Sequence, residues 1–399
     1  MLIFLLLLLL TGLFPLPSTA IYTPLREYAG DSFFSGWDYY GNVDNTTLGN
    51  VTYVNQSTGV SQSLTYVDSI TGHAIIRVDN FTNIPNASIV NRNSVKITTK
   101  EAYPVGSLVI IDAWHIPYGC SVWPAFWTLG INLEWPQAGE MDIIEAINNL
   151  GVNQYALHTS SGCSLPSPSS NSSSSILQSG NTIETNCTST FYSNEGCLVQ
   201  ESKPNSFGAE FAEAQGGVFA TQLDVSGIYI WFWSRSNIPA AISQANSSSK
   251  MDISSDWGTP TVAVPSSGCN ITQYFQAQQL VLDITLCGVW AGVQSIYSSS
   301  GCSGQCIDNV IGAGNPTYND AYWDIAYIRT YLSDTVTTTN ITGNSSSTSS
   351  ISTLLPSSSA ASSGNDANSK RVAAVSVPVH GLLWFFLLTL FGPTLILGW

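Results

Sequence analysis

Charged residues are scarce in this sequence, and basic residues are the scarcest. Only 9% of the 399 residues are charged, with 11 lysines and arginines against 26 aspartates and glutamates, so the net charge is −15. No run of basic residues occurs. Because nucleic acids and anionic membranes are bound through clustered positive charge, we expect neither as a partner. Neutral substrates remain open.

Several familiar catalytic patterns are also missing. The chain contains no G-x-S-x-G elbow, no P-loop, no G-x-G-x-x-G fingerprint and no H-E-x-x-H zinc motif. The short pair Cys302 and Cys306 has no second short cysteine pair that could complete a zinc site. We therefore predict neither a metal nor a cofactor.

Long helical patterns are absent, and short β-rich segments take their place. They are separated by Gly, Pro, Asn and Ser, which favour turns. The segments include Ser94–Thr99, Ser107–Trp114, Met141–Ile147, Ile228–Trp233, Gln279–Leu286 and Tyr322–Tyr331. A block of this kind over residues 21–334 predicts one large, all-β antiparallel sandwich with a substantial core.

Two features indicate the secretory route. An apolar run from Leu2 to Leu10 is followed by Ser18 and Ala20, small residues typical of a cleavage site, so residues 1–20 are predicted to be a signal peptide. N-glycosylation sequons are numerous. They begin at Asn45, Asn50, Asn55, Asn80, Asn86, Asn171, Asn186, Asn246, Asn270, Asn340 and Asn344. We expect a secreted protein.

Eight cysteines lie within the predicted sandwich, an even number that suits an oxidising compartment. They are Cys120, Cys163, Cys187, Cys197, Cys269, Cys287, Cys302 and Cys306. Disulfide bonds are the expected state. Eight cysteines allow 105 pairings, and the sequence leaves the pairing open.

The composition changes after Asp334. Residues 335–371 are rich in Ser and Thr and cannot bury enough apolar area to fold, so they are predicted to form an O-glycosylated stalk. Small residues at 363–367, a polar spacer and an apolar tail over 372–399 match a GPI-anchor signal. A membrane span is the alternative. Because no charged residue follows the tail, the anchor is favoured, and the membrane is expected to be reached only through this tail or its lipid.

The segment G-E-M-D-I-I-E at 139–145 concentrates three carboxylates among apolar residues. On a helix, steps of about 100° per residue would scatter them around the axis. On a strand, Glu140 and Asp142 share one face, and Glu145 joins them if a bulge takes up one of the two isoleucines. The apolar residues then point into a sheet core and the carboxylates line its other, concave face. An exposed acidic strand face is the alternative.

Strand geometry also predicts the spacing of the two glutamates. At about 3.3 Å per residue and about four steps, their Cα atoms would lie roughly 13 Å apart. Side chains that lean inward leave about 5 Å between the carboxyl groups, which is the separation expected of a retaining glycosidase. The 12 tryptophans supply ring faces on which sugars can stack.

E-M-D-I-I-E resembles the E-x-D-x-x-E signature of glycoside hydrolase family 16, in the laminarinase form with an extra bulge residue. The likeness to the fungal endo-1,3(4)-β-glucanases of this family spans residues 32–331. It includes W-P-A-F-W at 123–127, W-P at 135–136, L-H-T-S at 157–160, W-F-W-S-R-S at 231–236, W-G-T-P at 257–260, I-T-L-C-G at 284–288 and Y-W-D-I at 322–325. The resemblance implies a β-jelly-roll of the concanavalin A-like class, whose concave face carries a substrate cleft.

The resemblance also implies roles for the three acids and a β-glucan polysaccharide as substrate. Glu140 matches the nucleophile and Glu145 the general acid/base of a retaining enzyme, with Asp142 between them. Three crowded acids resist full ionisation, so one proton should be retained near neutral pH. A hydrogen bond between Asp142 and Glu140 would help to keep the two roles distinct.

Five further residues resemble substrate-binding positions of the family. Trp127, Trp135 and Trp257 match aromatic residues of the cleft, His158 a histidine near the acids, and Arg92 an arginine that reaches sugar hydroxyls. Each has a structural alternative. The tryptophans and the histidine could be ordinary core residues, and the arginine could be a surface residue.

Three functions stay open within this resemblance. Retaining endo-hydrolysis of β-1,3- or mixed β-1,3(4)-glucan is favoured by the bulge residue. A wall-remodelling transglycosylase of the same family would share the covalent intermediate, although its fungal members resemble E-x-D-x-E without that residue. A glucan-binding lectin without activity is disfavoured because all three acids are retained. We expect a monomer, and the motif does not encode the linkage preference.

Overall fold

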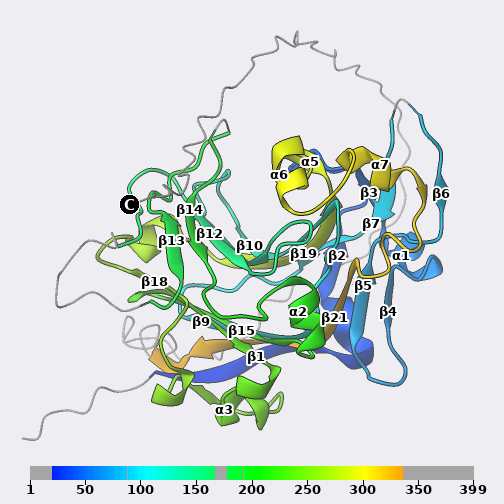
Figure 1. The fold of residues 1–399 in the computed structure, drawn as a ribbon. Helices are drawn as coiled ribbons and strands as arrows, with labels where there is room; N and C mark the ends of the chain where they lie inside the picture. Colours follow the sequence, from blue (N-terminus) through cyan, green and yellow to red (C-terminus); the bar gives the residue numbers. More distant parts are fainter. Residues whose placement is uncertain (1–19, 88, 167–177, 192, 336–399) are drawn as a thin grey trace, which may run out of the picture. The chain divides into compact units, whose positions relative to one another are not determined.

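The computed structural model describes residues 20–87, 89–166, 178–191 and 193–335 (Figure 1). These residues belong to one compact unit. The predicted signal peptide, except its last residue, lies outside the described ranges, as do the predicted tail and the stalk beyond Thr335. Within those ranges, no helix is both long and apolar enough to cross a membrane.

Two antiparallel sheets dominate the fold and form its two layers (Figure 1). We name them after the strands β9 and β11. The strand order in the β9 sheet is β17 (Met251–Asp252), β1 (Ile21–Ala29), β21 (Tyr322–Ser333), β9 (Ser107–His115), β15 (Gly217–Asp224), β16 (Gly227–Ser234) and β18 (Val262–Pro265), with β5 (Ala74–Arg77) also paired to β21 and β4 (Thr65–Val67) paired to β5. The order in the β11 sheet is β13 (Asn181–Glu184), β14 (Cys197–Gln200), β12 (Gln154–His158), β11 (Glu140–Glu145), β10 (Val122–Gly130), β19 (Gln278–Leu286), β8 (Lys96–Thr99) and β2 (Trp37–Tyr39).

The remaining described elements are short. Two small strand pairs are β3 (Val51–Tyr53) with β7 (Arg92–Ser94), which is parallel, and β6 (Asn83–Ile84) with β20 (Gly312–Ala313). The α-helices are α1 (Gln56–Ser61), α2 (Gly208–Glu213), α3 (Ala240–Ser243), α4 (Ile271–Tyr274), α5 (Gly288–Ala291), α6 (Gln294–Ser299) and α7 (Cys306–Val310). The 3-10 helices are η1 (Gly30–Gly36), η2 (Arg235–Asn237) and η3 (Ser255–Trp257).

Alternation along the strands explains where the core lies. On β9, Val109 and Ile111 enter the main core, which residues of both sheets share. Leu108 and Ile110 enter a second apolar cluster, on the other face of the same sheet. Because both faces are covered, residues 107–113 are all buried and read as a nearly continuous apolar run.

The β11 sheet turns one face to the main core. Its paired residues Met141 and Leu157, and likewise Phe126 and Leu282, are part of that core. The alternate residues form the opposite face, which we call the carboxylate face because it carries Glu140, Asp142 and Glu145. The predicted all-β antiparallel sandwich is thus confirmed, and each of the segments predicted as β-rich contains a strand.

All eight cysteines form disulfide bonds, as expected. The pairs are Cys120–Cys302, Cys163–Cys269, Cys187–Cys197 and Cys287–Cys306. Cys197 is the first residue of β14 and Cys287 directly follows β19. Two of the bonds therefore tie loops to strands of the β11 sheet.

Candidate active site

The bulge predicted from the acidic motif is present in β11. Against β12, the pairing passes from Asp142 to Glu145 with only one partner residue between them, so Ile143 and Ile144 stand opposite a single residue. Both isoleucines are buried in the main core. Glu140, Asp142 and Glu145 therefore share the carboxylate face, although Glu145 lies five positions after Glu140, an odd number that would place it on the other face of a regular strand.

Asn153 holds this bulge in place. Its Oδ1 accepts the backbone N–H of Glu145 at 2.9 Å, and its Nδ2 donates to the backbone oxygen of Ile143 at 2.9 Å. An extra residue takes such backbone groups out of the regular ladder, so they need another partner when buried. Asn153 is itself fully buried, and its backbone N–H donates to Ser206 Oγ at 3.0 Å.

Glu140 is paired with an indole. Trp135 Nε1 donates to Glu140 Oε2 at 2.7 Å, and the Trp135 side chain is 37% exposed. Burial and the charge of Asp142 raise the pKa of Glu140 to about 8, whereas His158 and the bond from Trp135 lower it. The structure therefore brings Trp135 to the acids, as expected. Its contact with substrate stays a prediction.

Asp142 is paired with His158. The distance from His158 Nε2 to Asp142 Oδ2 is 2.9 Å, and the other ring nitrogen, Nδ1, lies 3.0 Å from Ser189 Oγ. Burial and the charge of Asp283 raise the pKa of Asp142. The expected hydrogen bond between Asp142 and Glu140 is not among the bonds of the described residues. Asp142 has His158 as its partner instead. His158 lies directly opposite Glu140 on β12, so its ring stands beside both acids.

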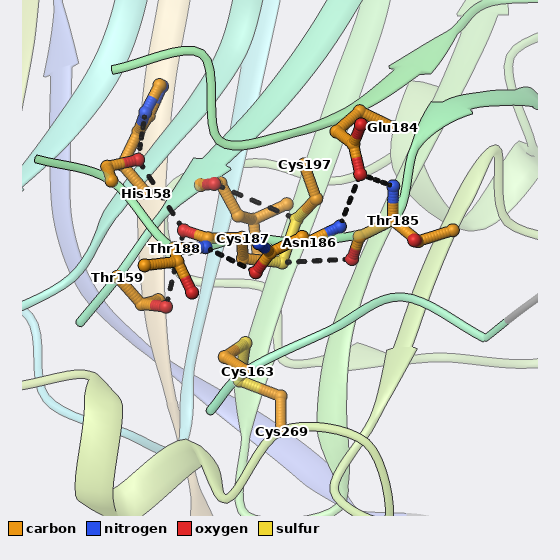
Figure 2. The surroundings of a disulfide bond; sticks show 12 residues. His158, Thr159, Cys163, Glu184, Thr185, Asn186, Cys187, Thr188, Cys197 and Cys269 are labelled. Carbon is orange, nitrogen blue, oxygen red and sulfur yellow. Dashed lines mark hydrogen bonds between the residues drawn. A yellow bond between two sulfur atoms is a disulfide. The ribbon is translucent and has the colours of Figure 1, made fainter. Parts of the chain in front are cut away.

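A disulfide fixes the surroundings of His158. Figure 2 shows His158 beside the Cys187–Cys197 bond. The backbone N–H of Thr159 donates to the oxygen of Cys187 at 2.9 Å, and Cys197 pairs with the residue before His158. The loop closed by this bond carries Ser189, the partner of His158 Nδ1. The histidine is therefore held from both ring nitrogens.

Glu145 has a separate indole partner. Trp123 Nε1 donates to Glu145 Oε1 at 2.8 Å, and the Trp290 ring packs edge-on against Trp123 with centroids 5.3 Å apart. Burial and the charge of Asp142 raise the pKa of Glu145, whereas the bond from Trp123 lowers it. All three acids thus have raised pKa values, so the set retains protons at neutral pH, as the crowding argument predicted.

Trp127 lies on the carboxylate face with a further charged pair. It stands opposite Asp142 across β10 and β11, and its Nε1 donates to Asp283 Oδ2 at 3.1 Å. Lys96 Nζ lies 3.9 Å from the same oxygen and 5.0 Å from the centre of the Trp127 ring. The structure brings Trp127 to the acids, and its role in substrate binding stays a prediction.

Trp257 does not reach this face, and its predicted place in the cleft is wrong. Its side chain is 2% exposed and lies in the second apolar cluster of the β9 sheet. Trp231 and Trp233 pack edge-on against it at 5.4 and 5.3 Å. A buried indole has no free ring face for a sugar, so the core alternative applies.

Arg92 is also wrongly predicted as a substrate-binding residue. Its side chain is fully buried. Its guanidinium donates to the backbone oxygens of four residues, and it lies over the Tyr318 ring at 5.1 Å. The four acceptors are Asp79, Thr82, Val310 and Gly312, at 3.1, 2.9, 2.8 and 2.8 Å. Arg92 therefore joins separate segments of the chain and cannot reach sugar hydroxyls.

The site residues that were not predicted include Trp123, Asn153 and Asp283. Trp123 had a usable signal, because positions 123 and 127 fall on one face of a strand. Asp283 also had one, since it is the sole charged residue within β19. Asn153 had no such signal in the sequence, because its role is to bind the backbone groups that the bulge leaves unpaired.

Geometry alone groups three possible ligands for a cation. The ligand atoms of Glu140, Asp142 and His158 lie within 4.8 Å of one another. The same side chains are already engaged in hydrogen bonds, His158 with Asp142 and Glu140 with Trp135. We therefore assign no metal to this group.

The site and fold agree with a known enzyme family. Residues 37–331 match the model of the XgeA-like, catalytic GH16 domain. Because this match covers most of the chain, the protein belongs to glycoside hydrolase family 16. It is a glycoside hydrolase of the β-1,3(4)-glucanase family, and the resemblance seen in the sequence is confirmed.

Curated relatives carry matching names. The chain is 34% identical to a probable glycosidase of Schizosaccharomyces pombe, over 78% of this chain and 69% of that protein. It is 36% identical to a probable endo-1,3(4)-β-glucanase of Aspergillus niger, over 79% of this chain and 41% of that protein. The chain thus spans less than half the length of the A. niger relative.

Solved structures confirm the jelly-roll fold. Laminarinase 16A from Phanerochaete chrysosporium, with β-glucans in both donor and acceptor sites, is 34% identical with a TM-score of 0.70. An elongating family 16 β-1,3-glucosyltransferase is also 34% identical, with a TM-score of 0.68. Each likeness covers 78% of this chain and 100% of the other.

Proposed function

We propose that the protein hydrolyses β-1,3- or mixed β-1,3(4)-glucan internally, with retention of configuration, through a covalent glycosyl-enzyme intermediate. The observation that carries this proposal is the bulge in β11, which sets Glu140 and Glu145 on one face with Asp142 between them. The names of the relatives and of the solved neighbours support the substrate class.

In the first step, Glu145 donates its proton to the glycosidic oxygen while Glu140 attacks the anomeric carbon. In the second, Glu145 takes a proton from water, which displaces Glu140 from that carbon. The surroundings suit these roles. Trp135 donates a hydrogen bond to Glu140, which lowers its pKa and favours the ionised form that attack requires. The pKa of both glutamates is raised, and the roles require that the retained proton reside on Glu145 when substrate is bound.

The direct test replaces each glutamate by glutamine. Glu140→Gln and Glu145→Gln preserve shape and remove an essential charge or proton, so each should abolish turnover of laminarin while the circular dichroism spectrum stays native. Near-normal hydrolysis by either folded variant would overturn the assignment.

Azide rescue distinguishes the two roles. Azide should restore Glu145→Ala by attacking the glycosyl-enzyme, and the product should be a β-glycosyl azide. With Glu140→Ala, azide should attack the sugar directly and give the α product. NMR of the first product of the unaltered enzyme should show the β-anomer. An initial α-anomer would exclude the retaining mechanism.

A second candidate function is glucan transfer, which the 34% identical β-1,3-glucosyltransferase favours. In that case a sugar hydroxyl replaces water as the acceptor of the same intermediate. Products from laminarin and mixed-linkage glucan, with and without an oligosaccharide acceptor, separate the two. Products longer than the substrate would show transfer. If all products are shorter than the substrate, the reaction is hydrolysis. Binding without any product would indicate the lectin alternative.

The proposed location is the cell surface, through secretion and a GPI anchor. The sequons, the disulfide bonds and the apolar tail support it, although the tail lies outside the described residues. A phosphoinositide-specific phospholipase should release active enzyme from cells. Mass spectrometry of the mature C-terminus checks the anchor, because an intact peptide from 385–399 would show a membrane span.

A further inference from the structure

A fourth carboxylate lies on the carboxylate face. Register places Asp283 of β19 opposite Ala125 of β10, and Ala125 opposite Glu145 of β11. Only a methyl side chain therefore stands in the row between Asp283 and Glu145. Asp283 is 7% exposed, and the two-step mechanism makes no use of it.

The contacts of Asp283 favour its ionised form. Its Oδ2 accepts the indole N–H of Trp127 at 3.1 Å and lies 3.9 Å from Lys96 Nζ. The side chains of Lys96 and Asp283 are only 9% and 10% exposed, so solvent screens this pair weakly. Burial raises the pKa of Asp283 to about 6, and Lys96 and Trp127 keep it from rising further. The carboxyl group is therefore an anion at neutral pH.

We propose that Asp283 is a positioning residue whose negative charge keeps the transferable proton on Glu145. An anion two strands away in the same sheet makes ionisation of Asp142 and Glu145 less favourable, and both acids respond to the charge of Asp283. Retention of the proton at higher pH extends the range in which Glu145 can act as an acid. This inference rests on the proposed role of Glu145.

Other charges near Asp283 do not cancel this effect. Lys96 is on β8, one strand further from β11 than Asp283 is, so its charge acts more weakly on Glu145. Asp44 adds a negative charge on the same side and accepts a hydrogen bond from Thr285 at 2.7 Å. On the other side, β11 contributes Glu140 and Asp142 beside Glu145, and β12 contributes His158.

The expected size follows from the strand spacing. Two strand intervals, or about 10 Å, separate β19 from β11. At that distance and an effective dielectric constant of about 20, the charge of Asp283 raises the pKa of Glu145 by about one unit. Asp283→Asn keeps an oxygen that can accept the Trp127 bond and removes the charge. The alkaline limb of kcat/KM should move about one unit lower in pH.

Two variants provide the controls. Asp283→Glu keeps the charge and should keep the alkaline limb, even if the maximum rate falls. Asp112→Asn removes a buried, ion-paired carboxylate from the β9 sheet, where Arg235 Nη2 lies 2.7 Å from Asp112 Oδ1, and should leave the limb unchanged. An Asp283→Asn profile that falls equally at all pH values, with no movement of the limb, would overturn the proposal.

A readout without turnover separates this inference from the proposed function. Carbon-13 NMR of labelled glutamate carboxyls, assigned with Glu145→Gln, follows the titration of Glu145 in the free protein. Its midpoint should fall by about one unit in Asp283→Asn. An unchanged midpoint would overturn the inference. Absence of hydrolysis by the unaltered enzyme would instead overturn the proposed function.

Discussion

At the scale of single residues, two indoles each bind a different catalytic candidate: Trp135 binds Glu140 and Trp123 binds Glu145. Each bond stabilises the ionised acid and lowers its pKa. Trp135→Phe should raise the pKa of Glu140 and move the acidic limb of kcat/KM to higher pH, because the nucleophile must be ionised. Trp123→Phe should move the alkaline limb to higher pH, because Glu145 would keep its proton longer.

Both replacements keep an aromatic ring, so the protein should stay folded. The rate at the optimum should fall roughly tenfold, the effect of one hydrogen bond to a charged group. Complete pH profiles of both variants check the prediction. If Trp135→Phe moved the alkaline limb and Trp123→Phe the acidic one, the roles of the two glutamates would be reversed.

Arg92 leads to a prediction about stability. Its buried guanidinium donates to four backbone oxygens, so Arg92→Met should lower the free energy of unfolding by about 3 kcal/mol or more. Arg26→Met is the matched control, because Arg26 pairs with Glu101 at the surface. This replacement should lower the free energy of unfolding by less than about 1 kcal/mol. Urea denaturation measures both. A raised KM in a fully stable Arg92→Met would restore its predicted role in the cleft.

The contrast between the acids and Arg92 shows what local sequence can predict. The shared face of Glu140, Asp142 and Glu145 depends only on strand alternation and one bulge, both of which are local. Two of the four acceptors of Arg92 lie in α7 and β20, more than 200 residues away along the chain. Trp257 likewise depends on indoles of a distant strand. Periodicity along one segment carries no information on such partners.

At the scale of elements, the bulge in β11 depends on Asn153. Asn153→Ala would leave the backbone N–H of Glu145 and the oxygen of Ile143 without these partners in a buried place. We expect a loss of about 2–4 kcal/mol in unfolding free energy, and lower activity because Glu145 is no longer held. Asn149→Ala, at an exposed position of the same loop, is the control. Normal stability and activity of Asn153→Ala would show that the bulge does not depend on the Asn153 side chain.

Strands and short helices differed in how well they could be predicted. The long strands were readable because their β-branched and apolar residues follow a two-residue period or a continuous buried run. Helices such as α5, which places Trp290 against Trp123, have four to six residues and show no helical period. Disulfide pairing was unreadable for a related reason, since it depends on which loops meet in space.

At the scale of the whole molecule, the three acids should make stability fall as pH rises. The pKa of Glu140 is about 8 in the folded protein and close to its ordinary value of 4.5 when unfolded. Its contribution is therefore fully present below about pH 4.5 and is lost as pH rises through about 8. Glu140→Gln removes this loss. The variant should be more stable than the parent by a few kcal/mol at pH 8.5 and nearly equal at pH 4.

Thermal unfolding of the two proteins across this pH range checks the sign. The comparison between variant and parent cancels the titrating groups that do not interact with Glu140. Greater stability of the parent at pH 8.5 would mean that the Glu140 carboxylate is stabilised, not strained, by its surroundings. That outcome would require a folded pKa below the ordinary value.

The boundary of the folded domain follows from β21. This strand pairs with β1 and β9 on its two sides and ends at Ser333, and Asp334 accepts a hydrogen bond from Thr23 Oγ1 at 2.6 Å. A protein of residues 21–334 therefore keeps every strand of both sheets. We expect its free energy of unfolding to lie within about 0.5 kcal/mol of that of a protein that also carries the stalk, 21–371. Both proteins should hydrolyse glucan at the same rate, because Ser and Thr add no apolar surface to the core.

Removal of β21 provides the opposite case. A protein that ends before Tyr322 loses the central partner of β1, β9 and β5, so it should not fold. Circular dichroism and laminarin hydrolysis, measured on all three proteins, test the boundary. If residues 21–334 failed to fold while residues 21–371 folded, the region after Asp334 would belong to the domain, and the division between sandwich and stalk would have to move toward the C-terminus.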